Sequence, residues 1–165
     1  MTKGALKIPP QHKEAKQKAM KGLVVCPSCH NIYYKKAWHA ANSKELESFK
    51  RSKQELNFKL CPACEMKKNH LFEGEIVISE VPKKYKPELV HLLLSQGAQM
   101  QKKDPQDRII DIEETKDGYR VTTTEDQMAQ KLAKKIKKVF NKVDLDISYS
   151  GEPFEVVRIR VQFLR

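Results

Sequence analysis

Hydrophobic and polar residues follow regular periods from Gly74 to the end of the chain. Residues 75–81 (EIVISEV) alternate as in a β-strand, and Pro82 ends the alternation because proline cannot donate a ladder hydrogen bond. Pro87 suits the first turn of a helix, and Asp104-Pro105 ends that helix. The residues that follow its 3.6-residue period are Leu89, Leu92, Leu93, Gln96 and Met100. The pattern therefore predicts a strand followed by a helix.

The next segment, RIIDIEETKDGYRVTTT, contains two short runs around Lys116-Asp117-Gly118. An Asp-Gly pair between alternating runs is a strong signal for a β-hairpin. The alternation places Ile110 and Ile112 opposite Tyr119 and Val121.

A second helix is predicted to begin at Thr124, where Thr-Glu-Asp-Gln forms a capping box that ends at Gln127. Its expected buried stripe consists of Met128, Leu132, Ile136, Val139 and Phe140. A second hairpin should follow, with a turn at Ser150-Gly151-Glu152. Its inward residues alternate as Val143, Leu145, Ile147 and Tyr149, and then as Val157, Ile159, Val161 and Phe163.

The predicted elements occur in the order strand, helix, two strands, helix, two strands. This order contains a helix–strand–strand (αββ) unit twice and suggests an internal repeat. We expect an α+β domain over residues 74–165, with two helices on one face of a mainly antiparallel sheet.

The first 73 residues lack this regularity. Residues 1–21 have few large apolar side chains and contain Pro9-Pro10, which predicts a flexible basic arm. Residues 22–73 contain all four cysteines and form a separate module. Within that module, residues 43–57 carry a weak apolar stripe after Ser43, a residue suited to capping, and predict a helical insert.

The four cysteines form two Cys-Pro-x-Cys pairs, Cys26 with Cys29 and Cys61 with Cys64. Two residues between thiols let both sulfurs point at one ion from a tight turn, and four thiolates suit tetrahedral zinc. The 31 residues between the pairs exceed the usual ribbon spacing, but the cost of closing a loop grows slowly with its length. The sequence therefore predicts a zinc ribbon with one structural zinc ion. Such a site has no open coordination position, so the metal contributes to folding and does not activate water.

Three alternatives to this zinc site remain open. A thioredoxin-like redox site uses one such pair, so the second pair argues against it. A rubredoxin-like iron site has the same four-sulfur geometry. In such a site, however, each cysteine pair is usually followed by glycine, where this chain has His30 and Glu65. Alternatively, His30, His39 or His70 replaces a cysteine as ligand, but a histidine beside a complete four-cysteine set more often lies at the surface or supports a ligand without touching the metal.

Positive charge is concentrated in the same part of the chain as the cysteines. The chain carries a net charge of +11, of which residues 1–73 hold +9. A basic patch raises the local concentration of polyanions, although lysine-rich tails also serve solubility alone. Lysines alternate with aromatic rings after the first cysteine pair, a mixture that suits single-stranded or looped RNA. The candidate RNA contacts are Tyr34, Lys35, Lys36, Trp38, Lys50, Arg51, Lys53, Lys67 and Lys68.

The aromatic rings after the first cysteine pair, and the lysines of the second predicted helix, also have explanations that do not involve RNA. Tyr33 and Trp38 are equally suited to packing the small core of a metal module. The second predicted helix also carries Lys131, Lys134, Lys135, Lys137 and Lys138 away from its apolar stripe, and a solvated helix face explains them adequately. Contact with nucleic acid at that helix is a secondary hypothesis.

The composition excludes several classes of protein. No stretch approaches the roughly 18 apolar residues of a membrane span, and the N-terminal segment has no apolar secretion signal. We therefore expect a cytoplasmic protein, in which paired cysteines bind metal more often than they form disulfides. We find no Gly-rich phosphate loop, no His-Glu-x-x-His and no nucleophile elbow, so we expect no enzymatic activity and no small-molecule substrate.

Several segments resemble a known family, the small prokaryotic zinc-ribbon proteins related to the metal-binding region of the Nmd-type large-ribosomal-subunit export adaptor. The resemblance rests on CPSCHNIYYKKAW, CPAC, RIIDIEETKDGYRVTTTEDQMAQKLA and VVRIRVQFLR, and covers most of residues 24–165. It implies a non-enzymatic role on the ribosome or ribosomal RNA, with the four cysteines as metal ligands.

The leading hypothesis is therefore a cytoplasmic zinc-ribbon protein that binds the ribosome or structured RNA. A second hypothesis is a protein–protein adaptor whose zinc ribbon is only a scaffold. An iron-containing electron carrier is a third.

Overall fold

We describe the protein from a computed structural model, which describes residues 23–41, 47, 48, 51, 55–150 and 155–165. The described residues form two compact units, one within residues 1–71 (the N-terminal unit) and one within residues 72–165 (the C-terminal unit). The sequence placed this boundary two residues later, at residues 73 and 74. The predicted basic arm, residues 1–21, lies outside the described residues.

The N-terminal unit contains a sheet of short strands and a helix. The described strands are β1 (Leu23–Val25), β2 (Ile32–Tyr34), β3 (Ala37–His39) and β4 (Leu56–Phe58), in the spatial order β3-β2-β1-β4. Helix α2 spans Pro62–Lys68. Leu23, Val25 and Ile32 are buried together, with Leu56 and Ala41 packed against them. This apolar core is small.

Most of the predicted helical insert, residues 43–57, lies outside the described residues. Residues 47, 48 and 51 are helical. Leu56 and Asn57, at the end of the predicted insert, instead belong to β4, which runs parallel to β1 and pairs with Leu23 and Val24. Pairing with β1 overrides the weak helical stripe at this point.

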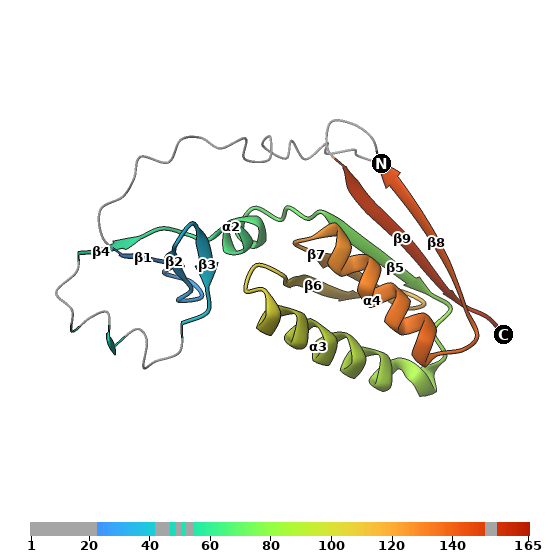
Figure 1. Cartoon of the computed structure of the whole chain (residues 1–165). Helices are drawn as coiled ribbons and strands as arrows, with labels where there is room; N and C mark the ends of the chain where they lie inside the picture. Colours follow the sequence, from blue (N-terminus) through green and yellow to red (C-terminus); the bar gives the residue numbers. More distant parts are fainter. Residues whose placement is uncertain (1–22, 42–46, 49–50, 52–54, 151–154) are drawn as a thin grey trace. The chain divides into compact units, whose positions relative to one another are not determined.

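The C-terminal unit has a mixed α+β architecture (Figure 1). Its elements are β5 (Gly74–Ser79), the short 3₁₀ helix η1 (Lys83–Tyr85), α3 (Lys86–Lys103), β6 (Ile109–Glu114), β7 (Tyr119–Thr123), α4 (Asp126–Val139), β8 (Val143–Ser150) and β9 (Val156–Phe163). The strands are arranged in the order β6-β7-β5-β9-β8. Strand β5 is parallel to β9, and the other three pairings are antiparallel.

Helices α3 and α4 lie side by side over one face of this sheet (Figure 1). They contribute Leu89, Leu93, Met128, Leu132 and Ile136 to a single core with the inward residues of the strands. The inward alternation predicted for residues 157–163 is confirmed, since Val157, Ile159, Val161 and Phe163 are buried. Burying this apolar surface is the main term that stabilises the unit.

The register of the first hairpin differs in part from the prediction. Ile112 pairs with Val121 as predicted, but Tyr119 pairs with Glu114. The register shifts between Ile109 and Asp111, which removes Ile110 from the regular pairing. The turn contains Gly118 for a steric reason, because a Cβ atom there would clash with the carbonyl oxygen of Ile78.

The capping box predicted at Thr124 is wrong. Helix α4 begins at Asp126, with Glu125 at the N-cap and no side-chain capping bond. The Thr124 hydroxyl instead donates to the carbonyl oxygen of Gln106 at 2.6 Å and accepts from the backbone N–H of Arg108 at 2.9 Å. The Thr124 hydroxyl therefore forms hydrogen bonds with the loop before β6, whereas the sequence predicted that it caps the helix.

Two residues predicted to be buried are exposed. Val139 is 40% exposed near the end of α4, and Tyr149 is 63% exposed near the end of the edge strand β8. The predicted turn at Ser150-Gly151-Glu152 lies largely outside the described residues.

The sheet face opposite the helices is polar and carries a charged cluster. Glu75 accepts from Arg120 on β7 and from Arg158 on β9, with nitrogen–oxygen distances of 2.7 Å in both pairs. Its side chain is only 9% exposed, so the two guanidinium groups compensate a buried carboxylate.

Candidate metal centre

The first cysteine pair lies in the turn that joins β1 to β2. Cys26 directly follows β1, its backbone N–H donates to the carbonyl oxygen of Asn31 at 2.8 Å, and the N–H of His30 donates to its carbonyl oxygen at 2.9 Å. His30 has a φ of 64°, in the left-handed region that favours glycine. Here His30 adopts the backbone conformation that a glycine would adopt more readily.

The second pair lies at the first turn of helix α2, whereas the sequence predicted a tight turn like the first. Cys61 is the N-cap residue, and its sulfur accepts from the backbone N–H of Cys64 at 3.4 Å. Pro62 at the first helical position explains the difference, because its fixed φ suits a helix and it needs no hydrogen-bond acceptor there.

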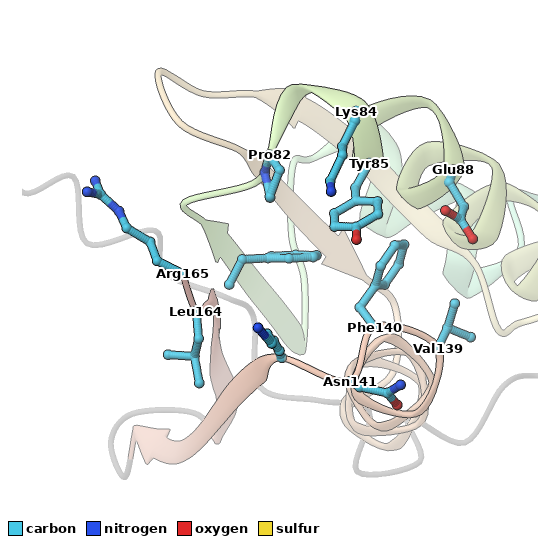
Figure 2. A pocket seen from close by; sticks show the side chains of 11 residues that line it. Pro82, Lys84, Tyr85, Glu88, Val139, Phe140, Asn141, Leu164 and Arg165 are labelled. Carbon is cyan, nitrogen blue, oxygen red and sulfur yellow. The ribbon is translucent and has the colours of Figure 1, made fainter.

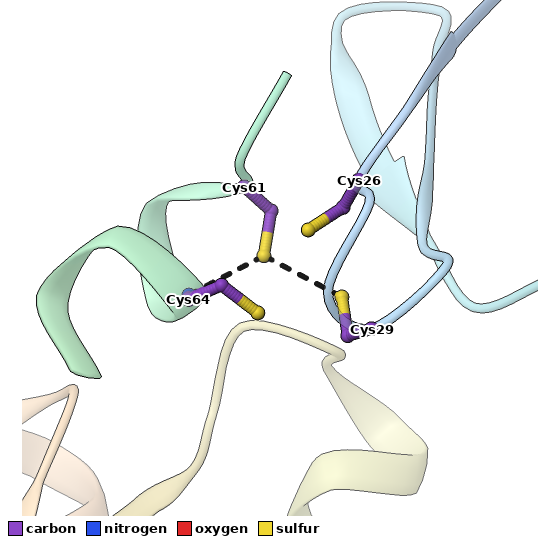
Figure 3. A group of neighbouring side chains, drawn as sticks. All are labelled: Cys26, Cys29, Cys61 and Cys64. Atoms are coloured by element: carbon purple, nitrogen blue, oxygen red, sulfur yellow. Dashed lines mark hydrogen bonds between the residues drawn. The ribbon is translucent and has the colours of Figure 1, made fainter. Parts of the chain in front are cut away.

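The four sulfur atoms lie together (Figure 3). All four Sγ atoms are within 4.8 Å of one another, and those of Cys29 and Cys61 are 3.6 Å apart. Bonds of about 2.3 Å to one tetrahedral ion would separate two sulfurs by about 3.8 Å, close to this distance. The four cysteines form no disulfide with one another, and Cys26, Cys61 and Cys64 are buried. The donor set and its geometry therefore fit a single metal ion.

The electrostatics around Cys26 favour the form that binds metal. Burial of the thiol raises its pKa, but hydrogen bonds from the backbone of Cys29, Cys61 and Ser28 and from the Cys29 side chain outweigh burial and lower the pKa to about 6. Cys26 is therefore largely a thiolate at neutral pH, and the thiolate is the metal ligand.

Trp38 packs against the thiols. Together with Leu60 it lies against the buried cluster of Cys26, Cys61, Ala63 and Cys64. The ring of Tyr33 lies 5.4 Å from that of Trp38. The indole, predicted both as an RNA contact and as a core group, thus shields one side of the sulfur cluster.

The cysteine group in the described part of the chain includes none of the three histidines considered as alternative ligands. His39 instead has its Nε2 atom 3.0 Å from the carbonyl oxygen of Tyr34. His30 and His70 are exposed and have positive φ values of 64° and 53°.

Three predicted RNA contacts form the tip of the β2–β3 hairpin. Tyr34 pairs with Ala37, so Lys35 and Lys36 are the two residues of the turn, with φ values of 47° and 63°. A two-residue hairpin turn with both φ values positive normally contains Asn-Gly. All three side chains are exposed, and the Lys35 ammonium lies 5.2 Å from the centre of the Tyr34 ring.

The other predicted contacts are more scattered. Lys67 and Lys68 are exposed in the last turn of α2, and Arg51 is also exposed. Lys50 and Lys53 lie outside the described residues.

A second cluster of possible metal ligands was not predicted from the sequence. Carboxylate oxygens of Glu73, Glu125 and Asp126 lie within 4.8 Å of one another. Burial of Glu73, with a further contribution from the nearby charges of Glu125 and Asp126, raises its pKa to about 7. Only the proximity of Glu125 to Asp126 is visible in the sequence, because Glu73 reaches them through the fold.

No family model matches this chain, and no curated protein matches it. Within the described residues, none of the helices is both long enough and apolar enough to cross a membrane.

Proposed function

We propose that the chain is a non-enzymatic zinc protein that associates with the ribosome, or with ribosomal or other structured RNA, through its N-terminal unit. One structural zinc ion is held by Cys26, Cys29, Cys61 and Cys64. The observation that carries the proposal is a strained, lysine-bearing hairpin tip in the same unit as the four thiols.

Zinc is supported by the donor set. Four sulfur donors around one point suit tetrahedral zinc, and all four positions are supplied by the protein. A closed site of this kind holds structure and leaves no place for a reacting water. It also compensates for the small apolar core of the unit, since metal binding contributes directly to folding.

RNA association is supported by the backbone strain at the hairpin tip. Lys35 and Lys36 occupy left-handed positions that cost a residue with a Cβ about 1 kcal/mol or more each. Strained residues that persist in a structure are concentrated at functional sites. Beside them stands Tyr34, 47% exposed, which offers a stacking surface next to two ammonium groups.

The charge distribution supports the same partner. Residues 1–73 hold +9 of the net charge of +11, so the unit attracts polyanions at a distance. Lys67 and Lys68 add exposed positive charge at the end of α2.

Elemental analysis of the purified protein tests the metal. We expect one zinc per chain and its loss in a Cys26→Ser/Cys61→Ser variant. Stoichiometric iron with visible colour would instead favour the rubredoxin-like alternative.

The double variant Lys35→Asn/Lys36→Gly tests the partner. It restores the favoured turn sequence, so we expect the unit to become more stable by about 1–2 kcal/mol while salt-sensitive binding to ribosomal RNA weakens. Lys102→Ala/Lys103→Ala, which removes two exposed charges at the end of α3, is the matched control and should bind as the unchanged protein does.

Co-sedimentation with ribosomal subunits at low and moderate salt completes the test. If the protein neither sediments with ribosomes nor binds RNA in a salt-sensitive way, the proposal fails. A salt-insensitive complex with a single protein would favour the adaptor hypothesis.

A further inference from the structure

We propose a second nucleic-acid contact, a nucleotide-binding cavity in the C-terminal unit that accepts one base of a single-stranded RNA. This inference rests on the proposed function, because it deepens RNA association by assigning it a specific site.

The cavity lies where η1, the end of α4 and the end of β9 meet (Figure 2). Its volume is about 580 Å³, within the range of small-molecule sites. Aromatic side chains from three separate elements line it, namely Tyr85, Phe140 and Phe163. Their ring centres are 5.3–6.3 Å apart.

The three rings differ in how much surface they leave for a ligand. Phe140 is 6% exposed and Phe163 is 4% exposed, so both serve mainly as the floor of the cavity. Tyr85 is only partly buried and offers the ring on which a base can stack. The Lys84 ammonium lies over that ring, 4.8 Å from its centre, in a cation–π contact whose place a stacked base would take.

The rim of the cavity is basic. Lys84, Lys142 and Arg165 line it, against one carboxylate, that of Glu88. Arg165 extends away from the cavity in Figure 2 and lies 3.9 Å from Glu80, so Lys84 and Lys142 are the better phosphate partners.

A second hollow of about 340 Å³ adjoins the first and shares Pro82, Phe163, Leu164 and Arg165 with it. Its own lining includes Lys83, Lys86 and Lys116, with the carboxylates of Glu80 and Asp117. Lys86 is paired with Glu114 at 2.9 Å, which leaves Lys83 and Lys116 as the stronger candidates for a second phosphate.

Helix α4 extends this positive surface. Residues 127–142 contain six lysines and no acidic residue, and the helix ends at the cavity. An aromatic cavity at the end of a row of lysines matches single-stranded nucleic acid, whose bases stack while its phosphates follow positive charge. A peptide of acidic residues alone has charges for the lysines but no ring to stack on Tyr85.

Two variants of the full-length protein test the site, with a short fluorescent oligouridylate as the probe. Lys84→Ala/Lys142→Ala removes two exposed ammonium groups without touching the core. We expect binding to weaken about 5- to 10-fold, and the slope of log affinity against log salt to fall by about 1.4. Tyr85→Leu keeps an apolar contact with Phe140 and Phe163 but removes the stacking ring, and should weaken binding about 5-fold or more.

Lys102→Ala/Lys103→Ala is again the charge-matched control, at the opposite end of α3 from the cavity, and should change binding less than 2-fold. Thermal unfolding of each variant separates loss of binding from loss of folding. If Tyr85→Leu does not fold, the Lys84→Ala/Lys142→Ala variant alone tests the site.

Photocrosslinking of a 4-thiouridine oligonucleotide to the unchanged protein locates the contact. Crosslinks on peptides that contain Tyr85 or Phe140 would support the site. If RNA binds but crosslinks map only to residues 23–71 and the cavity variants bind normally, this inference fails and the proposed function stands. If no RNA binds, both fail. Displacement of the probe from the cavity by an oligoglutamate peptide, with the same sensitivity to the variants, would overturn the assignment to nucleic acid.

Discussion

His30 occupies a backbone conformation that few residues other than glycine adopt readily. Its φ of 64° is required because the chain must return from Cys29 towards β2 within the turn that holds the first cysteine pair. At the scale of single residues, this turn, the Lys35-Lys36 turn and the Glu73 carboxylate depart from ordinary local preferences.

Replacing His30 with glycine should strengthen the metal centre. Glycine relieves the left-handed strain, so we expect the free energy of unfolding of the zinc-loaded unit to rise by about 0.5–1 kcal/mol. Competition with a chelator measures the gain as slower loss of metal. Ser28→Gly is the control in the same turn, because Ser28 has no positive φ, and it should lower stability. Faster metal loss in His30→Gly would contradict the prediction.

Glu73 should make the stability of the C-terminal unit depend on pH. Its pKa in the folded protein is about 7, above its ordinary value of 4.5, so the folded state binds the proton more tightly than the unfolded state does. The contribution of the protonated Glu73 carboxyl to the free energy of unfolding is fully present below about pH 4.5 and is lost as the pH rises to about 7. A fully buried group with this shift would account for about 3 kcal/mol, and for a half-exposed one we expect about 1–2 kcal/mol.

Chemical unfolding of Glu73→Gln at several pH values measures this effect. The variant should lose less stability between pH 4.5 and 7 than the unchanged protein. Asp144→Asn, which removes an exposed carboxylate on β8, is the control. It should lose as much stability between pH 4.5 and 7 as the unchanged protein does. An identical pH profile for Glu73→Gln and the unchanged protein would refute the role of Glu73.

At the scale of elements, alternation and helical periodicity were reliable guides where an element has one buried face. The inward residues of β9 and most of the stripe of α4 are buried as predicted. The predictions failed at the ends of elements, where distant segments supply the partners. Thr124 bonds the loop before β6, and Cys61 caps α2 with its sulfur.

The bonds of Thr124 yield a prediction that separates the two interpretations of this segment. Thr124→Val keeps the shape of the side chain but leaves the N–H of Arg108 without this acceptor, and should lower the free energy of unfolding by about 1–3 kcal/mol. A capping box would make Gln127 equally important, whereas we expect Gln127→Ala to change stability by less than about 0.5 kcal/mol. Denaturant unfolding of both variants provides the comparison, and equal losses would restore the capping box.

At the scale of the whole molecule, the chain consists of two units with different sources of stability. The C-terminal unit has a large apolar core built from its helices and sheet. Among its described residues, the N-terminal unit has small apolar clusters around Leu23, Val25 and Ile32 and around the cysteines, so we expect its fold to depend on a bound metal.

Removing the metal should therefore unfold one unit and leave the other folded. After chelation we expect rapid hydrogen exchange in residues 23–41 and 55–71 and unchanged protection in residues 72–165. Mass spectrometry of peptides after exchange measures both regions in one sample, and adding zinc back should restore protection. Equal loss of protection in both units would show that the metal stabilises the whole chain.

The sequence by itself determined the features that depend on neighbours along the chain. Four cysteines in two close pairs predict one group of thiols, and the structure brings them together. The periods of residues 74–165 predict strands and helices, and an Asp-Gly pair marks the first hairpin. The hairpin and the periods are local signals because turn chemistry and side-chain periodicity are set by adjacent residues, whereas the two cysteine pairs were matched because one tetrahedral ion needs four donors.

Only the tertiary structure decided which distant segments meet. The position of β5 between β7 and β9 brings Glu75 between Arg120 and Arg158, and the packing of η1, α4 and β9 creates the aromatic cavity around Tyr85. No local pattern predicts such contacts, because they follow from the order of strands in the sheet and from which helix ends it brings together. The group of four thiols could thus be predicted from the sequence, whereas the cavity could be found only in the fold.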